Sequence, residues 1–444
     1  MKKLHSFLWG FLLALSALWW WADTTVYSEL PHFFAWRAVL MQYSGVLAIG
    51  VMSVSMLLAL RPVVLEPHVG GLDKMYRLHK WLGISALVLS LGHWLLAQGT
   101  KWLVGWGWLE RPGRGPRPPL PDDLIRQFFS SQRGLAESMG EWAFYLAVVL
   151  MVLALIKRFP YKHFFKTHHV LAVTYLVLVW HAVVLLQWSY WSTPLGVLQA
   201  ALMAGGSVSA VLVLLGRVAR NRKVVGEVVG VRQHAALQVV EIDIAFKGAW
   251  AGHQAGQFAY VTLHPKEGAH PFTISSAWKN DGRMRFIIKA LGDYTSTLSE
   301  QVEVGDEVVV EGPYGRFTFQ GTQPRQIWIG GGIGITPFVA RMKALADAPD
   351  ARTVDLFHTT AVYDDHVVQR LEQDAQDAGV NLHVLWDERD GRLDAHTLAR
   401  KVPDWKNADI WFCGPARFGQ ALRSKLLAMG LDGRRFHQEL FEMR

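Results

Sequence analysis

The sequence predicts a multi-domain membrane protein: a six-helix transmembrane bundle, then an antiparallel β-barrel domain, then a parallel α/β domain. Three observations lead to this fold class. Residues 1–216 hold six apolar stretches, residues from 224 onward form short β-type runs with glycine turns, and residues after 323 alternate strand-like with helix-like segments. We place the domain boundaries at 1–220, 221–322 and 323–444.

The composition of the 444-residue chain fits this division. Hydrophobic residues make up 51% and charged residues 18%, which disfavours disorder. The net charge of +8 is uneven, with 21 Lys+Arg against 9 Asp+Glu up to residue 223 and 24 against 28 beyond it. Because the basic excess belongs to the apolar half, we expect membrane lipid and no nucleic acid as a partner. The single cysteine, Cys413, excludes an intramolecular disulfide framework.

The apolar stretches give the expected membrane topology. They cover about Leu4–Trp21, Val39–Leu60, Leu82–Ala97, Trp142–Ile156, Val170–Trp188 and Leu195–Leu215. Clusters of Lys and Arg fall on one side of six alternating helices, and tryptophans gather on the other, which assigns the basic side to the cytoplasm. We therefore expect a multi-pass protein of the inner cell membrane with both soluble domains in the cytoplasm.

Four histidines lie at the ends of two of these stretches. His79 and His93 are 14 residues apart, and His168 and His181 are 13 apart, or about 21 and 19.5 Å along a helix. The two helices run in the same direction, so His79 is level with His168 and His93 with His181. Two level pairs suit the axial ligands of two haems, one near each membrane face.

Helical geometry leaves one of these ligands open. A separation of 14 residues places His79 and His93 about 40° apart around the axis, whereas 13 residues place His168 and His181 about 140° apart. Either the helix that contains His168 and His181 is distorted, for example by a π-bulge, or His169 replaces His168 as the ligand. The second alternative still leaves about 120° between His169 and His181.

The barrel contains a run suited to a flavin. Aromatic rings and hydroxyls in HPFTISS can stack on an isoalloxazine ring and hydrogen-bond its polar edge. A following loop can approach a pyrophosphate through backbone N–H groups. The expected contacts are His270, Pro271, Phe272, Thr273 and Ser275 in the run, and Lys289, Gly292 and Thr295 in the loop.

Two turns of the α/β region suit a dinucleotide. The run GGGIGITP follows a strand and opens a helix, and CGP ends a later strand at the carboxyl edge of the sheet. The expected contacts are Gly331, Gly332, Gly334, Thr336, Pro337, Gly414 and Pro415. Cys413 either packs in the core or contacts the nicotinamide, without acting as a nucleophile.

Together these motifs resemble the NADPH oxidase and ferric reductase family of transmembrane flavocytochromes b, over nearly the whole chain. The matching elements are the two histidine pairs, HPFTISS, LGDYT, GPYG, GGGIGITP, CGP and the terminal Glu439-Leu440-Phe441. The resemblance implies that His79, His93, His168 and His181 bind two b-type haems, which favours His168 over His169. It implies FAD at the HPFT run and the downstream Thr295, and NADPH or NADH at the GGGIGITP and CGP turns.

The resemblance also assigns roles to three further residues. Phe441 would shield the flavin, Glu439 would lie near the nicotinamide, and Arg37 would lie near the outer haem. The oxidase branch commonly has another histidine four residues after the outer ligand, where this chain has Ala97. Asp364 and Asp365 stand where an arginine would meet the 2′-phosphate of NADPH, so we expect NADH to be acceptable.

The expected activity is electron transfer from cytosolic NAD(P)H through FAD and two haems to an external acceptor. The absence of the oxidase histidine favours ferric iron or a ferric chelate as that acceptor. The alternatives are oxygen, giving a superoxide-generating oxidase, and a quinone or periplasmic redox partner. Two other readings are a haem-binding membrane sensor or transporter with a fused flavin domain, and a flavin reductase tethered by inert helices.

Overall fold

The computed structural model describes all residues except 1, 28–32, 111–122, 157–158, 160 and 440–444. The chain forms two compact units. One contains Met1–Leu65 and Lys74–Val218, and the other contains Glu66–Asp73 and Ala219–Met443. The short segment Glu66–Asp73 therefore belongs by its contacts to the soluble unit, although membrane helices precede and follow it.

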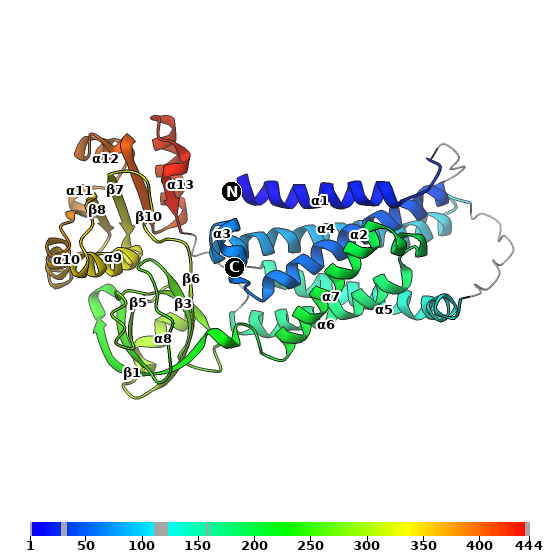
Figure 1. Cartoon of the computed structure of the whole chain (residues 1–444), viewed down its shortest axis with the longest axis horizontal. Coiled ribbons are helices and arrows are strands. Elements are labelled where there is room, and N and C mark those ends of the chain that lie inside the picture. Colours follow the sequence, from blue (N-terminus) through cyan, green and yellow to red (C-terminus); the bar gives the residue numbers. More distant parts are fainter. Residues whose placement is uncertain (1, 28–32, 111–122, 157–158, 160, 440–444) are drawn as a thin grey trace. The chain divides into compact units, whose positions relative to one another are not determined.

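Within the described residues, six helices are long and apolar enough to cross a membrane, which confirms the expected bundle. Figure 1 shows them running side by side. The helix α4 is 34 residues long and begins ten residues before the apolar stretch that predicts it. The helix α7 begins after Thr193, whose hydroxyl caps the Gly196 N–H, with Pro194 in its first turn. The six are α1 (Lys2–Ala22), α2 (Phe33–Ala59), α4 (Leu72–Gly105), α5 (Leu124–Leu155), α6 (Tyr161–Leu185) and α7 (Pro194–Leu214).

The first part of the soluble unit is an antiparallel barrel, as expected. Its strand order is β4-β3-β6-β1-β2-β5, and a bridge between Ile274 and Phe286 connects the two edges. Alternate residues of β5, among them Met284, Phe286 and Ile288, point into the core. The elements are β1 (Lys223–His234), β2 (Val239–Phe246), β3 (Phe258–Thr262), β4 (His270–Thr273), β5 (Arg283–Lys289), α8 (Asp293–Gln301) and β6 (Glu307–Tyr314).

The second part is a five-stranded parallel sheet with the order β11-β10-β7-β8-β9, again as expected. Every residue of β10 is buried, as in strands covered on both faces. The strands are β7 (Arg325–Gly331), β8 (Thr353–Thr360), β9 (Asn381–Trp386), β10 (Ala408–Cys413) and β11 (Phe436–Gln438). The helices are α9 (Thr336–Asp347), α10 (Asp365–Asp377), α11 (Asp387–Asp390), α12 (Ala395–Lys401) and α13 (Ala416–Ala428).

Short helices connect these elements. They are α3 (Glu66–Val69) and the 3-10 turns η2 (Val63–Leu65), η3 (Trp188–Ser192), η4 (Arg220–Arg222), η5 (Ala235–Leu237), η6 (Gly332–Ile335), η7 (Trp405–Asn407) and η8 (Gly433–Arg435).

Candidate functional site

Two histidines of α4 face two histidines of α6, forming two pairs. The ring centroids of His79 and His168 are 6.0 Å apart, and those of His93 and His181 are 6.3 Å apart. Two metal–nitrogen bonds of about 2 Å, plus about 1.1 Å from each nitrogen to its ring centroid, amount to roughly 6.2 Å. Each pair therefore has a ring spacing that would allow its two imidazoles to hold one metal ion between them.

The donor set in these pairs suits haem better than a bare metal ion. In the part of the chain that the structure describes, no group of three or more His, Cys, Asp or Glu side chains could hold a metal. Two imidazoles leave four coordination positions, which a porphyrin supplies. The residues present therefore fit a bis-histidine haem at each pair.

Neighbouring groups orient three of the four rings. The Nδ1 of His79 donates to the Ser55 carbonyl at 3.0 Å, and the Nδ1 of His181 donates to the Ala136 carbonyl at 2.8 Å. The Nδ1 of His93 lies 3.0 Å from the hydroxyl of Ser44, which itself donates to a backbone carbonyl. An imidazole held through Nδ1 presents Nε2 to the metal.

The helix α6 resolves the angular question raised by its sequence. It is α-helical without interruption from Tyr161 to Leu185, so no π-bulge is present. The ring that faces His79 is that of His168, and not that of His169. His168 and His181 thus reach their partners from flanks of α6 that are about 140° apart.

Arg37 lies in the first turns of α2 and reaches the end of α4 that carries His93. Its Nε donates to the Leu96 carbonyl at 2.7 Å. Leu96 is three residues beyond His93, so this bond places the Arg37 guanidinium about one helical turn from the His93–His181 pair.

The flavin run forms β4 and the residues after it. The rings of His270 and Tyr294 stack at 4.4 Å, and the Phe272 ring lies 6.3 Å from His270. Pro271 pairs with Tyr260 of β3, and Thr273 is buried beside the strand end. This end of the barrel therefore presents a surface of aromatic rings suited to a flat ring system.

Ser275 and Thr295 use their hydroxyls within the protein. Both the backbone N–H and the hydroxyl of Ser275 donate to the Arg285 carbonyl at 2.9 Å, and the residue is fully buried. The Thr295 hydroxyl accepts from the N–H groups of Leu291 and Gly292. Ser275 thus closes the barrel, and Thr295 shapes the loop that follows Lys289 at the end of β5.

The glycine-rich turn and the CGP turn pack against each other. Cys413 pairs with Gly330 where β10 and β7 end. A side chain at Gly334 would lie 2.2 Å from the Cys413 carbonyl oxygen, so only glycine allows this approach. Gly332 has φ +55° and open space beside it. Gly331 lies beside Gly414 and Pro415, and Thr336 and Pro337 begin α9 after the turn.

Glu439 and Cys413 meet at the same sheet edge. Both are buried, and a Cβ on Gly315 at the end of β6 would lie 3.5 Å from the Glu439 carboxylate. Burial, together with the nearby charge of Glu439, raises the pKa of the Cys413 thiol well above its ordinary value. The thiol is therefore neutral, which suits a contact residue and not a nucleophile. Phe441 lies outside the described residues.

One further part of this site was missed by the sequence analysis. The segment Glu66–Asp73 packs on the end of β6, where the backbone at Gly71 comes close to Arg316. Glu66 is buried, and burial raises its pKa against the opposing effects of Arg222 and the Gly315 N–H. No motif marks this segment, because its position depends on contacts with residues about 250 positions away in the chain.

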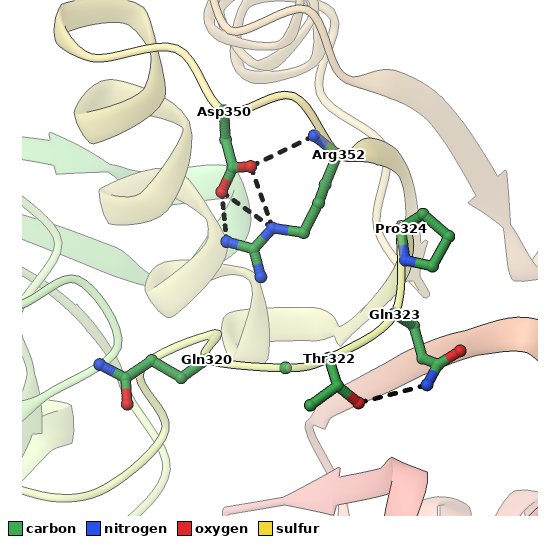
Figure 2. A pocket seen from close by; sticks show the side chains of 7 residues that line it. Gln320, Thr322, Gln323, Pro324, Asp350 and Arg352 are labelled. Atoms are coloured by element: carbon green, nitrogen blue, oxygen red, sulfur yellow. Dashed lines mark hydrogen bonds and ion pairs between the residues drawn. The ribbon is translucent and has the colours of Figure 1, made fainter.

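The hollow shown in Figure 2 lies away from the two turns that are expected to bind the dinucleotide. It has a volume of about 520 Å³ and is lined by residues 320–324 together with Asp350 and Arg352, which form an ion pair. These residues precede β7 and β8, so they lie at the amino edge of the parallel sheet. The glycine-rich turn lies at the carboxyl edge, where open α/β sheets bind ligands.

Three family models match the chain in sequence order. They are a ferric reductase like transmembrane component at residues 44–179, an FAD-binding domain at residues 233–318 and an oxidoreductase NAD-binding domain at residues 328–424.

Similar proteins include flavohemoproteins and the reductase subunits of other enzymes. A flavohemoprotein of Bordetella pertussis is 27% identical over 44% of this chain and 54% of its own length. The stachydrine N-demethylase reductase subunit of Rhizobium meliloti is 27% identical over 44% of this chain and 60% of its own length. The chain thus spans little more than half the length of these relatives.

Two solved structures are also similar. The FAD/NAD-binding domain of a Vibrio cholerae nitric oxide dioxygenase has a TM-score of 0.44 and 24% identity, covering 49% of this chain and 97% of that domain. A flavohemoglobin from Malassezia yamatoensis has a TM-score of 0.48 and 16% identity, covering 91% of this chain and 98% of that structure.

Proposed function

Because the chain belongs to the ferric reductase-like membrane proteins with fused FAD-binding and NAD-binding oxidoreductase domains, we propose that it carries electrons from cytosolic NAD(P)H through FAD and two b-type haems to an external acceptor. The observation that carries this proposal is the presence of two histidine pairs with ring spacings of 6.0 and 6.3 Å. FAD converts hydride transfer into single-electron transfer, and haem iron relays single electrons.

The protein's own residues orient these groups. His79 and His168 hold the inner haem, and His93 and His181 hold the outer one, about 21 Å further along α4. Two haems are needed because one cannot span a hydrocarbon core of about 30 Å. The aromatic end of the barrel holds the flavin, and the turns at Gly331–Gly334 and Cys413–Pro415 hold the nicotinamide dinucleotide.

We propose ferric iron or a ferric chelate as the acceptor. Ala97, four residues after the outer ligand, cannot act as the additional histidine of the oxidase branch. Arg37, near the start of α2, supplies a positive charge close to the outer ligand His93 of α4. A positive charge there suits an anionic chelate such as ferric citrate.

NADH is an acceptable electron donor in this proposal. Asp364 caps α10 at the carboxyl edge of β8 by accepting from the Val367 N–H, and Asp365 follows it. Two carboxylates at this position repel the 2′-phosphate of NADPH. Comparing kcat/KM for the two nucleotides tests this point, and a large preference for NADPH would contradict it.

An anaerobic visible spectrum of the purified protein tests the central proposal. Haem and flavin are quantified, and spectra are recorded before and after NADH is added. Two haems per FAD, both reduced by NADH, are the expected result. Flavin reduction without haem would leave only a membrane-tethered flavin reductase.

Membrane vesicles test the direction of transfer and the acceptor. In inverted vesicles, external NADH reaches the soluble domains, and the enclosed ferric chelate should be reduced without oxygen. Right-side-out vesicles loaded with NADH should reduce external chelate. Superoxide formation in air, with no anaerobic reduction of chelate, would instead assign the protein to the oxidases.

A further inference from the structure

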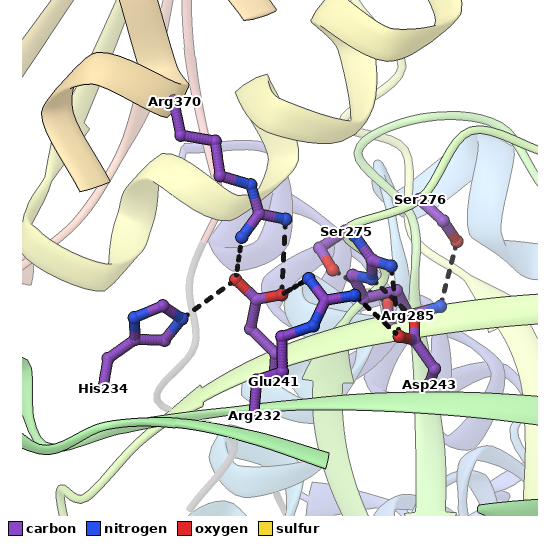
Figure 3. Close-up of polar contacts among 8 residues, drawn as sticks. All are labelled: Arg232, His234, Glu241, Asp243, Ser275, Ser276, Arg285 and Arg370. Carbon is purple, nitrogen blue, oxygen red and sulfur yellow. Dashed lines mark hydrogen bonds and ion pairs between the residues drawn. The ribbon is translucent and has the colours of Figure 1, made fainter. Parts of the chain in front are cut away.

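An ion network connects the barrel with the nucleotide-binding sheet inside the soluble unit. Arg370 of α10 donates from Nη1 to Glu241 Oε1 at 2.8 Å and from Nη2 to Oε2 at 3.3 Å, and Figure 3 shows this two-point contact. Glu241 belongs to β2 of the barrel and is 6% exposed. A bidentate contact to a buried carboxylate restricts both distance and orientation.

Glu241 has two more basic side chains beside it, both on β1. His234 Nε2 lies 3.2 Å from Oε1, and Arg232 Nη1 lies 3.6 Å from Oε2. Burial alone would raise the pKa of Glu241, but the guanidinium groups of Arg370 and, to a lesser extent, Arg285 hold it below the ordinary value. The carboxylate is therefore charged and available to Arg370 at neutral pH.

The network continues to the flavin run. Arg232 also lies 3.9 Å from Asp243, whose carboxylate accepts from Arg285 at 2.6 and 3.1 Å. The backbone of Arg285 binds the residues that follow β4: its carbonyl accepts from Ser275, and its N–H donates to the Ser276 hydroxyl. A chain of polar contacts thus runs from the flavin run to α10.

The other end of this chain of polar contacts lies near the proposed nucleotide site. The helix α10 begins directly after Asp364, which follows β8 at the carboxyl edge of the parallel sheet. Displacing α10 therefore displaces the edge on which the nucleotide would lie. Hydride transfer is sensitive to such a shift, since a misplacement of about 1 Å can cost roughly a hundredfold in rate.

We propose that Glu241 and Arg370 are positioning residues for hydride transfer, holding the nucleotide-binding sheet in register with the flavin barrel. This inference rests on the NAD(P)H-to-FAD step of the proposed function and does not involve the haems. The same interface offers a contrast in the pair Lys279–Asp347, which joins the barrel region to α9 at 2.8 Å but has both side chains more than half exposed. Exposed ion pairs contribute little to the stability of an interface.

Anaerobic stopped-flow of the full-length protein tests the proposal by following flavin absorbance after mixing with NADH. Arg370→Met should slow flavin reduction at saturating NADH by about tenfold or more, with little change in the NADH concentration needed for half the maximal rate. Arg370→Lys, which keeps the charge but not the two-point contact, should be intermediate. Lys279→Met should stay within about twofold of the wild type.

Two measurements separate positioning from folding. The FAD content of Arg370→Met should match the wild type, and dithionite should reduce its haems normally. Wild-type flavin reduction in Arg370→Met, or equal slowing in Lys279→Met, would overturn the proposal. So would loss of FAD in both Arg370→Met and Glu241→Gln, because the network would then serve folding. Absence of haem would contradict the proposed function and leave this test intact.

Discussion

In the proposed topology His93 and His181 are the outer pair and His79 and His168 the inner pair, and the two pairs have similar ring spacings but different support. In the outer pair both rings have a partner at Nδ1, Ser44 for His93 and the Ala136 carbonyl for His181. In the inner pair the Ser55 carbonyl supports His79, whereas the Nδ1 of His168 is buried without a hydrogen-bond partner among the described residues. Ring spacing thus decides whether a haem can be held, and the second contact of each ring decides its basicity.

This difference predicts unequal haem potentials. A hydrogen bond donated by Nδ1 makes an axial imidazole a stronger donor, which stabilises ferric over ferrous iron. The outer haem, with both imidazoles supported, should therefore have the lower midpoint potential. Redox potentiometry of the purified protein should resolve two transitions.

The largest expected effect comes from removing one inner ligand. His168→Ala should lose the inner haem, so that haem falls from two to one per FAD and NADH no longer reduces the remaining haem. His169→Ala is the matched control and should keep both haems. Haem quantification with reduced-minus-oxidised spectra gives the answer, and the reverse pattern would make His169 the ligand.

A slightly smaller effect is expected from crowding the outer pair. A Cβ on Gly140 would lie 2.0 Å from His181 Nδ1, so Gly140→Ala must displace this ring and break its bond to Ala136. We expect lower occupancy of the outer haem, with the inner transition unchanged. Gly45→Ala is the control, because its Cβ would stand 3.4 Å from His93 Cε1. Full occupancy of both haems in Gly140→Ala would contradict the geometry of the outer pair.

Removing the Ser44 hydroxyl should narrow the gap between the two potentials. A net hydrogen-bond contribution of about 1 kcal/mol corresponds to roughly 40 mV for one electron, so Ser44→Ala should raise the outer midpoint by up to about 40 mV. The Met41 backbone is a second partner for His93 and limits the shift. Ser53→Ala, which removes a buried hydroxyl bonded to Tyr175, serves as a control. A shift of the inner midpoint alone would contradict the assignment.

The smallest effect is expected at Ser55. Its hydroxyl lies 3.2 Å from His79 Nδ1, but its backbone carbonyl accepts from the same nitrogen at 3.0 Å and remains in Ser55→Ala. The inner midpoint should therefore move less than the outer midpoint moves in Ser44→Ala. A larger shift would show that the hydroxyl, and not the carbonyl, supports His79.

Much of the architecture could be predicted from local patterns. Six apolar runs predicted six membrane helices because hydropathy and length act within each segment. The levels of His79 and His93 followed from the helical rise, and the turn at Gly331–Gly334 followed from its place between a strand and a helix. Helix ends were less accurate, as in α4, because polar residues such as Lys74 and Arg77 continue a helix beyond its apolar part.

Other features depended on segments that are distant in the chain. The facing ring could have been that of His168 or His169, and the orientation of α6, which packs against α5, α7 and α2, selects His168. Ser44, Ala136 and Glu66 have no sequence signature, because each acts through a contact made across the fold. Hydropathy, helical rise and turn chemistry are local properties that a sequence displays directly. Side-chain support and domain register arise only when separate elements pack, so the tertiary structure alone decided them.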